Sequence, residues 1–318
     1  MAAGTITIFG GSGFIGRYVV ARLADRGWTI RVAVRQPERA KFLKPLGNVG
    51  QIVPLPCTLL DDASVAAALA GSDAVINLVG ILHEQGRQRF DAVQAEGAER
   101  VARAAAAAGI ERFLQVSAIG ADENSPSAYG RSKAAGEAAV RRHLPGAVIV
   151  RPSIVFGAED DFFNRFASLA RFSPVLPLIG GGTTRFQPVY VGDVADAVVA
   201  ALESPASRGR TYEVGGPQVY SFRELMELML GVVRRRRLLL SLPFGLARLL
   251  ALPLGLLPAP PLTRDQVELL KRDNLVSEGA EGLEAFGIRP HSVEVILPTY
   301  LDRYRAGGRY SERLPRSS

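Results

Sequence analysis

The sequence contains little of what builds a disulfide scaffold or a metal centre. Cys57 is the only cysteine, and the three histidines, His83, His143 and His291, lie far apart along the chain. A single cysteine excludes an internal disulfide, and ligands this scattered do not match the short spacings of a Cys/His zinc site. We therefore expect no metal, and the composition suits a reducing compartment.

The chain is also poor in aromatic residues. They make up 7% of the 318 positions, whereas 47% are hydrophobic and 22% are charged, which is close to the average for a globular protein. This composition excludes a wholly disordered chain and a collagen. The 38 basic against 31 acidic side chains give a net charge of +7, which fits nucleic acid, anionic lipid or an acidic protein face as a partner.

The N-terminus lacks the features of a secretory signal. The segment MAAGTITIFGGSGFIG begins an apolar strand at Thr5 and contains neither a basic region nor a small-residue cleavage site. We therefore expect the protein to work on the cytoplasmic side.

Strand and helix patterns alternate through the first half of the chain. Helix-period segments such as Phe14–Arg26 and Asp91–Ala108 lie between short β-branched runs. The runs predicted to be buried strands are Thr5–Phe9, Thr29–Val34, Gln51–Leu55, Ala74–Val79, Arg112–Val116 and Ala147–Val150. This alternation predicts an α/β protein with a doubly wound parallel sheet, a Rossmann fold, whose ligand lies at the carboxyl ends of the strands.

The alternation weakens after residue 155. The later predicted elements are strands at Val189–Val191 and Arg210–Val214 and helices at Val194–Leu202, Ser221–Leu230 and Arg264–Lys271. The helix at Val194–Leu202 and both of these strands can still belong to the same domain as the first six strands. We expect a Rossmann domain from residues 1–155 and 188–218 and a smaller C-terminal region from 156–187 and 219–318. Thr263 and Gln266 have the spacing of a capping box.

Three glycines follow the first predicted strand and open the first helix. Gly10, Gly13 and Gly16 stand in the segment GGSGFIG, with Phe14 and Ile15 between the last two. Glycine suits a tight turn, the approach of the backbone to a pyrophosphate and close helix packing, while the helix N-terminus favours phosphate. In this context the motif predicts a dinucleotide site rather than an ordinary strand-to-helix turn.

The second predicted strand is followed by Arg35, where an acidic residue would bind the 2′-hydroxyl of the adenosine ribose. An arginine at this position favours a 2′-phosphate, so NADPH (NADP) is the expected cofactor, with Arg35 and Arg17 as phosphate ligands. The alternative is that both arginines are solvated surface residues.

Tyr129 and Lys133 lie four residues apart at the start of a predicted helix, so that the phenol and the ammonium share one helix face. Together with the glycine motif, this pair resembles the short-chain dehydrogenase/reductase superfamily, and in particular its extended and atypical members. The resemblance implies that Tyr129 is a general acid/base and that Lys133 binds the nicotinamide ribose.

Two more segments resemble that superfamily. RPSIVFG at 151–157, which includes Pro152, is similar to its segment after the sixth strand, and VYVGDVA at 189–195 is similar to a later strand-to-helix turn. We include Pro152 and Val79 among the cofactor-binding candidates.

Two positions depart from the superfamily's pattern. Thr58 stands where many relatives have an adenine-binding aspartate, and Ser117, the candidate for the catalytic serine, stands one or two residues earlier than that serine does in the superfamily. Ser117, Tyr129 and Lys133 therefore form either a catalytic triad or a cofactor-binding set without turnover.

Five further segments are NLVGIL at 77–82, VSAIGA at 116–121, EDDFFNRF at 159–166, GGGTTRFQPVY at 180–190 and PPLTRDQV at 260–267. They are similar to the alpha-subcomplex subunit nine family of respiratory complex I, NADH:ubiquinone oxidoreductase. This resemblance implies an NADPH-binding accessory subunit with a structural or assembly role, no independent turnover, and complex I subunits as partners. The alternative is an independent NADP-dependent reductase or epimerase/dehydratase of the extended short-chain type.

Four consecutive arginines, Arg234–Arg237, precede an apolar segment at Leu238–Pro261. This segment has eleven leucines and one charged residue, Arg248, in 24 positions. Prolines interrupt it before it reaches the ~20 residues that cross a bilayer. We predict instead a peripheral, membrane-associated surface at residues 234–261, where arginines meet anionic lipid and leucines share a helix face. The leucines of that face are Leu242, Leu246, Leu249 and Leu250.

Two alternatives for this segment stay open. The leucines can fill the core of the smaller region, or they can contact a protein partner. Nucleic acid is disfavoured, because neither a recognition helix nor a stacking aromatic platform accompanies the arginines.

Overall fold

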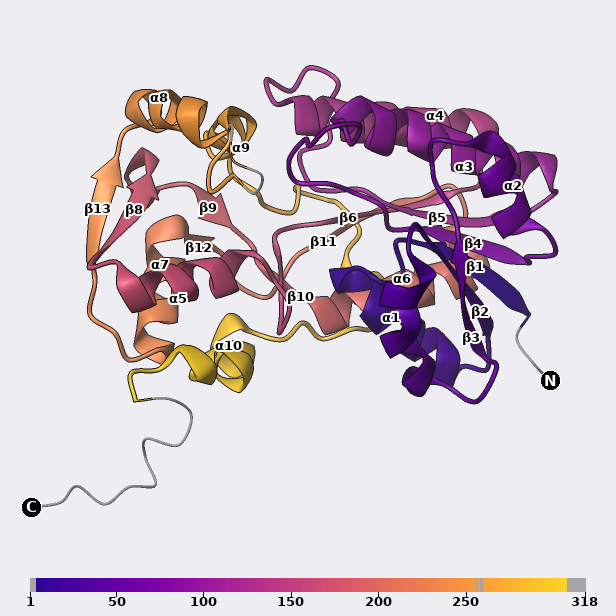
Figure 1. Cartoon of the computed structure of the whole chain (residues 1–318), viewed down its shortest axis with the longest axis horizontal. Helices are drawn as coiled ribbons and strands as arrows, with labels where there is room; N and C mark the ends of the chain where they lie inside the picture. The colour runs from indigo at the N-terminus through magenta and orange to yellow at the C-terminus, as the bar shows by residue number, and fades with distance from the viewer. Residues whose placement is uncertain (1–3, 256, 258–259, 308–318) are drawn as a thin grey trace, which may run out of the picture. The chain divides into compact units, whose positions relative to one another are not determined.

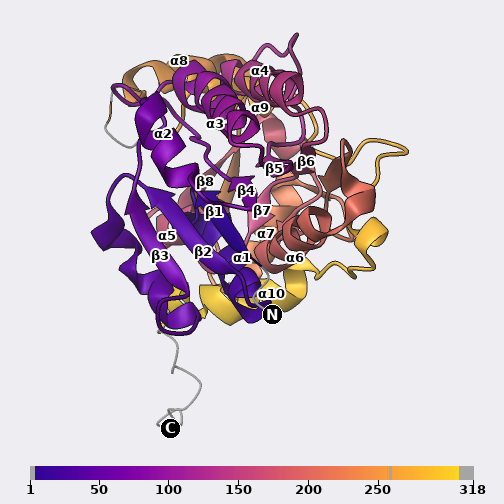
Figure 2. The same cartoon turned by 90° about the vertical axis from the view of Figure 1, so that its right-hand side faces the viewer.

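In the computed structural model, which describes residues 4–255, 257 and 260–307, seven segments form one parallel sheet. They are β1 (Thr5–Phe9), β2 (Thr29–Val34), β3 (Ile52–Pro56), β4 (Ala74–Asn77), β5 (Arg112–Val116), β6 (Val148–Pro152) and β11 (Thr211–Val214). Their spatial order is β11-β6-β5-β4-β1-β2-β3, and every neighbouring pair is parallel; Figure 2 shows the order from β6 to β3. The strand order reverses between β1 and β4, where doubly wound sheets bind ligands.

The strands form where β-branched residues run without interruption. Ile6, Ile8 and Val32 are fully buried because helices cover both faces of the sheet. Strands β1, β2 and β5 have the predicted bounds, and β3, β4 and β6 differ from the predicted ones by at most two residues at either end. The prediction of a doubly wound parallel sheet is confirmed.

Five long helices accompany this sheet. They are α1 (Phe14–Asp25), α2 (Asp62–Leu69), α3 (Glu96–Ala107), α4 (Ala128–His143) and α6 (Val191–Glu203). The shorter ones are η1 (Pro37–Leu46), η2 (Asp91–Ala95), η4 (Pro205–Ser207) and η5 (Leu283–Phe286). Helices α2, α3 and α4 cover one face of the sheet, and α1 and α6 cover the other (Figure 1).

The chain divides into two units. The first unit comprises Met1–Pro152, Val191–Val214 and Ser277–Arg289, and it contains the sheet and helices above. The second unit comprises Ser153–Tyr190, Gly215–Val276 and Pro290–Ser318. Residues 277–289, which we expected in the smaller region, belong to the first unit because they bond to β11: the N–H of Glu213 donates to the carbonyl of Glu281 at 2.9 Å.

The second unit contains three two-stranded sheets. Its strands are β7 (Val155–Phe156), β8 (Val175–Ile179), β9 (Arg185–Phe186), β10 (Val189–Tyr190), β12 (Tyr220–Ser221) and β13 (Leu238–Leu242). Its helices are α5 (Phe162–Phe172), α7 (Phe222–Val232), α8 (Phe244–Leu254), α9 (Arg264–Leu269), α10 (Val293–Leu301), η3 (Gly180–Gly182) and η6 (Asp302–Tyr304). The predicted capping box is confirmed, since Thr263 Oγ1 accepts from the N–H of Gln266 at 3.1 Å.

Two sequence-based expectations are wrong in the second unit. The strand expected at Val189–Val191 does not join the central sheet, because β10 pairs instead with β7, with Val189 opposite Val155. Leu242 does not share a helix face with the later leucines, because it ends β13, and α8 begins only at Phe244 after a proline. Residues 256 and 258–259 of the apolar segment lie outside the described residues.

Among the residues that the structure describes, we find no helix with the length and apolarity needed to cross a bilayer.

Candidate functional site

The glycine turn brings the end of β1 against the start of α1. Gly10 has a φ of +78°, which favours glycine, and its carbonyl accepts a hydrogen bond from the N–H of Gly13 at 3.0 Å. A methyl group on Gly16 would lie 2.4 Å from the Gly10 oxygen. The absence of side chains therefore allows α1 to begin directly at the turn. Phe14 and Ile15 are its first two residues, at a helix N-terminus that favours phosphate.

The loop after β4 lies beside this turn. A methyl group on Gly10 would lie 3.1 Å from the backbone nitrogen of Val79. The buried Asn77 side chain fixes the loop: its Oδ1 accepts from the N–H of Val79 at 3.1 Å, and its Nδ2 donates to Gln115 Oε1 at 2.9 Å. The predicted residues Gly10 and Val79 thus meet at the carboxyl edge of the sheet.

Tyr129 and Lys133 lie in the first two turns of α4. Ser127 caps this helix by accepting from the N–H of Gly130 at 3.3 Å. Lys133 Nζ lies 5.8 Å from the centre of the Tyr129 ring, and the edge of Phe90 packs on that ring at 5.8 Å. The expected proximity of phenol and ammonium is therefore present in the fold.

Lys133 is a buried cation at this edge. Burial lowers the pKa of Lys133 to about 8, and the negative charge of Glu137 opposes this shift. A methyl group on Gly80, in the loop after β4, would lie 3.1 Å from Lys133 Nζ. The ammonium therefore borders the loop that also carries Val79, which connects α4 with the glycine turn.

An ion pair anchors the part of α4 that follows Lys133. Glu137 accepts two hydrogen bonds from Arg151 of β6, at 2.9 Å and 2.6 Å. Arg151 also donates to Glu213 of β11 at 3.4 Å, and these contacts raise its pKa. A bidentate pair of this kind fixes the rotation of the helix and so the direction of Lys133.

Ser117 follows β5 directly, and its N–H donates to the carbonyl of Val150 at 2.8 Å. Its side chain is 4% exposed, and the Oγ has no hydrogen-bond partner among the described residues. Pro152 lies next to it, since the Pro152 carbonyl accepts from the N–H of Ile119 at 3.0 Å. A buried hydroxyl without a partner is unfavourable in a folded protein and suits a position where a ligand supplies the partner.

Gln94 is a candidate that the sequence analysis missed. The helix predicted over Asp91–Ala108 starts as a π-helix, η2, and such π-turns are frequent at functional sites. Gln94 Nε2 donates to Ser132 Oγ at 2.9 Å, whereas its buried Oε1 has no partner within the described part of the chain. A methyl group on Gly80 would lie 3.3 Å from this oxygen, so it borders the same loop as Lys133.

A signal for Gln94 existed in the sequence. Gln94 stands four, seven and eight residues before Ala98, Val101 and Ala102, all of which are buried on the inner face of α3. A polar residue on an apolar helical stripe indicates a buried polar group, which is a reason to consider it as a site residue.

The two predicted phosphate ligands differ in their surroundings. Arg35, directly after β2, is exposed, and its side chain has no hydrogen bond or ion pair with any residue described by the structure. Arg17 on α1 lies over the Phe42 ring at 5.1 Å, and its Nε donates to the Gly13 carbonyl at 3.4 Å. Arg35 is therefore available for a ligand at the end of β2.

Thr58, at the position expected for an adenine-binding aspartate, stabilises its own loop. Its N–H donates to Ser64 Oγ at 3.0 Å, and its Oγ1 accepts from the N–H of Leu60 at 3.3 Å.

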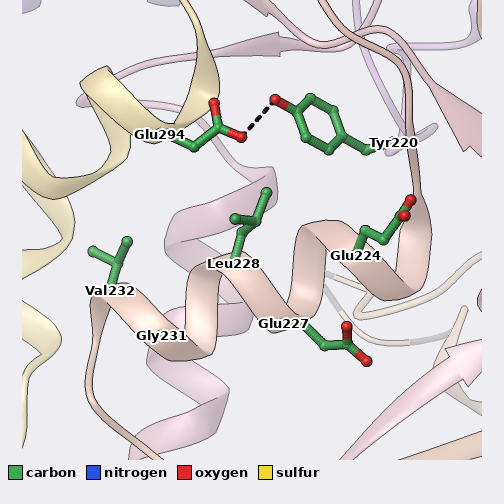
Figure 3. A pocket seen from close by; sticks show the side chains of 7 residues that line it. All are labelled: Tyr220, Glu224, Glu227, Leu228, Gly231, Val232 and Glu294. Atoms are coloured by element: carbon green, nitrogen blue, oxygen red, sulfur yellow. Dashed lines mark hydrogen bonds between the residues drawn. The ribbon is translucent and has the colours of Figure 1, made fainter.

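A separate cavity of about 600 Å³ lies in the second unit. Figure 3 shows that Tyr220 points toward Glu294, to which its hydroxyl donates at 2.7 Å, while Glu224, Glu227 and Leu228 line the cavity along α7. Burial and the Glu294 carboxylate raise the pKa of Tyr220. None of the predicted site residues lines this cavity.

Comparisons with known proteins agree with this geometry. Residues 6–215 match the NAD dependent epimerase/dehydratase family. Over 97% of its length the chain is 40% identical to "NADH dehydrogenase (ubiquinone) 1 alpha subcomplex subunit 9, mitochondrial" of Arabidopsis thaliana, of which it covers 81%. It is 36% identical to the ceramide reductase of Caulobacter vibrioides over 64% of this chain and 62% of that protein.

Solved structures show the same fold. The UDP-glucose 4-epimerase of Thermus thermophilus in complex with NAD superposes with a TM-score of 0.70 at 20% identity, over 94% of this chain and 98% of that chain. At this identity the likeness concerns the fold alone.

Proposed function

The chain belongs to the NAD dependent epimerase/dehydratase family and to the alpha-subcomplex subunit 9 family, and from this premise we propose that it is an NADPH-binding accessory subunit of respiratory complex I. One observation carries the proposal. The epimerase match ends at residue 215, whereas the 40% identity to the Arabidopsis subunit extends over 97% of the chain. The similarity therefore includes the second unit, which a shared cofactor domain alone does not explain.

The residues of the first unit fit a bound dinucleotide. The glycine turn offers a side-chain-free approach and helix N–H groups for a pyrophosphate. Arg35 is free to bind a 2′-phosphate, which makes NADPH the proposed form of the cofactor. Lys133 would hold the nicotinamide ribose, and Ser117 and Gln94 each offer a buried oxygen that no described residue hydrogen-bonds.

The proposed role is structural. When bound, NADPH supplies a hydride donor, but in an accessory subunit its binding free energy stabilises the folded first unit. In this role Tyr129 and Lys133 orient the cofactor rather than act on a substrate.

An independent reductase is the second candidate, favoured by the 36% identity to the ceramide reductase and by the intact Tyr129–Lys133 pair. In that case the Tyr129 hydroxyl would donate a proton to a substrate carbonyl oxygen, Lys133 would hold the ribose, and Ser117 would orient the carbonyl. Tyr129→Phe should then lower turnover by about 10²–10⁴-fold.

We propose a peripheral location for the protein, on the cytoplasmic side of the inner membrane and in contact with complex I subunits. The relatives named as subunit 9 are mitochondrial proteins, and this supports the link to a respiratory membrane.

Affinity purification from native membranes tests the proposal. The tagged full-length protein should co-purify with complex I subunits in mild detergent, and denaturation of the pure protein with methanol at neutral to slightly alkaline pH should release NADPH. The tagged Gly16→Ala variant, which should lose the cofactor, shows whether assembly depends on NADPH. If the wild type purifies without complex I subunits but reduces a carbonyl substrate with NADPH, the reductase is correct and the accessory role is wrong.

A further inference from the structure

Helix α8 buries its alanines and exposes its leucines. Ala247 and Ala251, one turn apart, are 0% and 2% exposed, and they pack with Ile179 and Val267. The outward leucines, each between 43% and 62% exposed, are Leu246, Leu249, Leu250 and Leu252. A helix at the surface of a globular protein normally has the opposite arrangement, because large apolar side chains gain most from burial.

Strand β13 leads into α8 (Figure 1), and two of its leucines are also exposed. Leu238 and Leu240 alternate with Leu239 and are 63% and 54% exposed, whereas Leu239 packs against the core of the second unit. We call the exposed leucines of β13 and α8 the leucine face; its residues are Leu238, Leu240, Leu246, Leu249, Leu250 and Leu252. The open alternative that this segment fills the core is therefore wrong for these residues.

The charged side chains of the segment that carries the leucine face are all positive. Residues 234–261 contain five arginines and no aspartate or glutamate. Arg236 is exposed, and its side chain makes no hydrogen bond or ion pair with another described residue. Arg235 and Arg237 donate to the carbonyls of Tyr304 at 3.0 Å and Ala170 at 2.8 Å. Arg248 lies 4.0 Å from Glu268 of α9.

We infer that the leucine face docks on an anionic lipid bilayer, with α8 in the plane of the membrane surface and the arginines before β13 beside lipid phosphates. The exposed side chains of α8 are leucines, a proline and one charged residue, Arg248, and four arginines precede β13. This combination is typical of interfacial helices, which combine apolar burial with attraction to anionic headgroups. The inference is independent of the cofactor and of complex I.

Flotation with vesicles tests the inference on the full-length protein. Vesicles of phosphatidylcholine and phosphatidylglycerol in equal amounts should carry the protein upward, whereas vesicles of phosphatidylcholine alone should bind it more weakly. Because exposed charges are screened within about 8 Å at physiological ionic strength, added salt should weaken but not abolish binding to the anionic vesicles.

Two variants separate the apolar and the charged contributions. The triple substitution Leu246→Gln, Leu249→Gln and Leu250→Gln should weaken binding by roughly tenfold or more, since apolar burial supplies much of the affinity. Its matched control replaces the equally exposed Leu60, Val219 and Val295 by Gln and should bind like the wild type.

The charge variant replaces Arg234 and Arg236 by Gln. Each loss should weaken binding to anionic vesicles by about fivefold. The control, Arg112→Gln with Arg289→Gln, removes the same net charge from exposed positions of the first unit and should have little effect. All substituted leucines are at the surface, and unfolding curves check that each variant folds.

A fluorescent probe at position 249 reports where the helix lies. Leu249→Cys accepts a polarity-sensitive label, while Cys57 is buried and burial raises the pKa of its thiol, which protects it from the reagent. The emission should shift to the blue with anionic vesicles, and a label at Val295→Cys should not respond.

Three results would overturn the inference. The first is that the wild type does not float with anionic vesicles, and the second is that the leucine variant floats as well as the wild type. The third is that the emission of the probe at position 249 does not shift when anionic vesicles are added. If the probe responds only to solubilised membrane proteins and not to vesicles, the leucine face binds a protein and the lipid assignment is wrong.

Discussion

The two units differ in the side chains that the described fold leaves unsatisfied, which are buried polar groups in the first unit and exposed leucines in the second. In the first unit, Ser117 Oγ and Gln94 Oε1 are buried without a hydrogen bond from any described residue. In the second unit, the buried carboxylate of Asp160 accepts from the N–H groups of Gly157, Phe163 and Asn164 and from the Tyr300 hydroxyl. The second unit instead exposes leucines on α8.

This difference indicates two kinds of binding. Unpaired polar atoms inside a fold suit a small ligand that supplies hydrogen bonds, because leaving them unpaired costs free energy. Exposed leucines suit a large surface that removes them from water. In our proposals the first unit binds a cofactor and the second a membrane surface, and each of the following predictions tests one side of this contrast.

The largest effect is expected for Gly16→Ala in the first unit. Its new methyl group would meet the Gly10 oxygen at 2.4 Å, so α1 must move away from β1. We expect the free energy of unfolding to fall by about 3 kcal/mol and NADPH binding to be lost. Denaturant unfolding and a fluorescence titration measure the two effects; a stable variant that binds NADPH normally would show that the turn is not tight.

The next effect concerns the pH dependence of the cofactor-free protein. The pKa of Lys133 is lowered by burial from 10.5 to about 8 in the folded state, so between these pH values the unfolded chain holds a proton that the folded chain has lost. The free energy of unfolding should therefore rise with pH across this window, by on the order of 2–3 kcal/mol from this group.

Lys133→Met should remove that rise, and the exposed Lys44→Met should retain it. Unfolding curves from about pH 7 to pH 10 measure the slopes. Equal slopes in the wild type and both variants would mean that Lys133 titrates normally and that its environment is not desolvated.

A smaller effect is expected for Arg35→Gln, which tests the form of the cofactor. Loss of a charge-assisted hydrogen bond costs about 2 kcal/mol, so the affinity for NADPH should fall by about 30-fold while that for NADH stays unchanged. Arg112→Gln is the control for net charge. An equal loss for both cofactors, or none for NADPH, would assign the 2′-phosphate to another residue.

In the second unit, Tyr300→Phe should destabilise without touching the cofactor. The Tyr300 hydroxyl donates to Asp160 Oδ2 at 2.5 Å, and burial of this carboxyl raises its pKa. We expect a loss of about 1.5 kcal/mol in the free energy of unfolding and an unchanged NADPH affinity. If NADPH affinity falls as well, the two units do not have separate roles.

The smallest effect, and the opposite sign, is expected for Gly231→Ala near the end of α7. Among the described residues outside the adjoining backbone of α7, a methyl group there meets no atom within 4 Å, and alanine favours a helix. The free energy of unfolding should rise by about 0.5–1 kcal/mol. Compared with Gly16→Ala, the same substitution then separates a glycine required by packing from one that is not.

Elements with local signals could be predicted from the residues alone. Thr5–Phe9 and Thr29–Val34 were predicted with their observed bounds, because β-branched residues run without interruption up to a turn. The capping box of Thr263 and Gln266 was also readable, since its hydrogen bonds join residues three apart. The spacing of the three glycines and that of Tyr129 and Lys133 also involve residues close together in the chain. They could therefore be used to predict which segments lie at the carboxyl edge of the sheet.

Which segments meet depends on long-range packing. The strand β10 has only two residues, Val189 and Tyr190, and so short a strand can pair with any free strand edge. Long-range contacts placed it beside β7 rather than in the central sheet. The π-turn that leaves Gln94 Oε1 unpaired has no local sequence rule. For α8, the leucines set the apolar character, but the packing of Ala247 and Ala251 on Ile179 and Val267 decided which side faces outward. Amphipathic pattern alone could not predict it, because burial is fixed by the neighbouring elements and both sides of this helix are apolar.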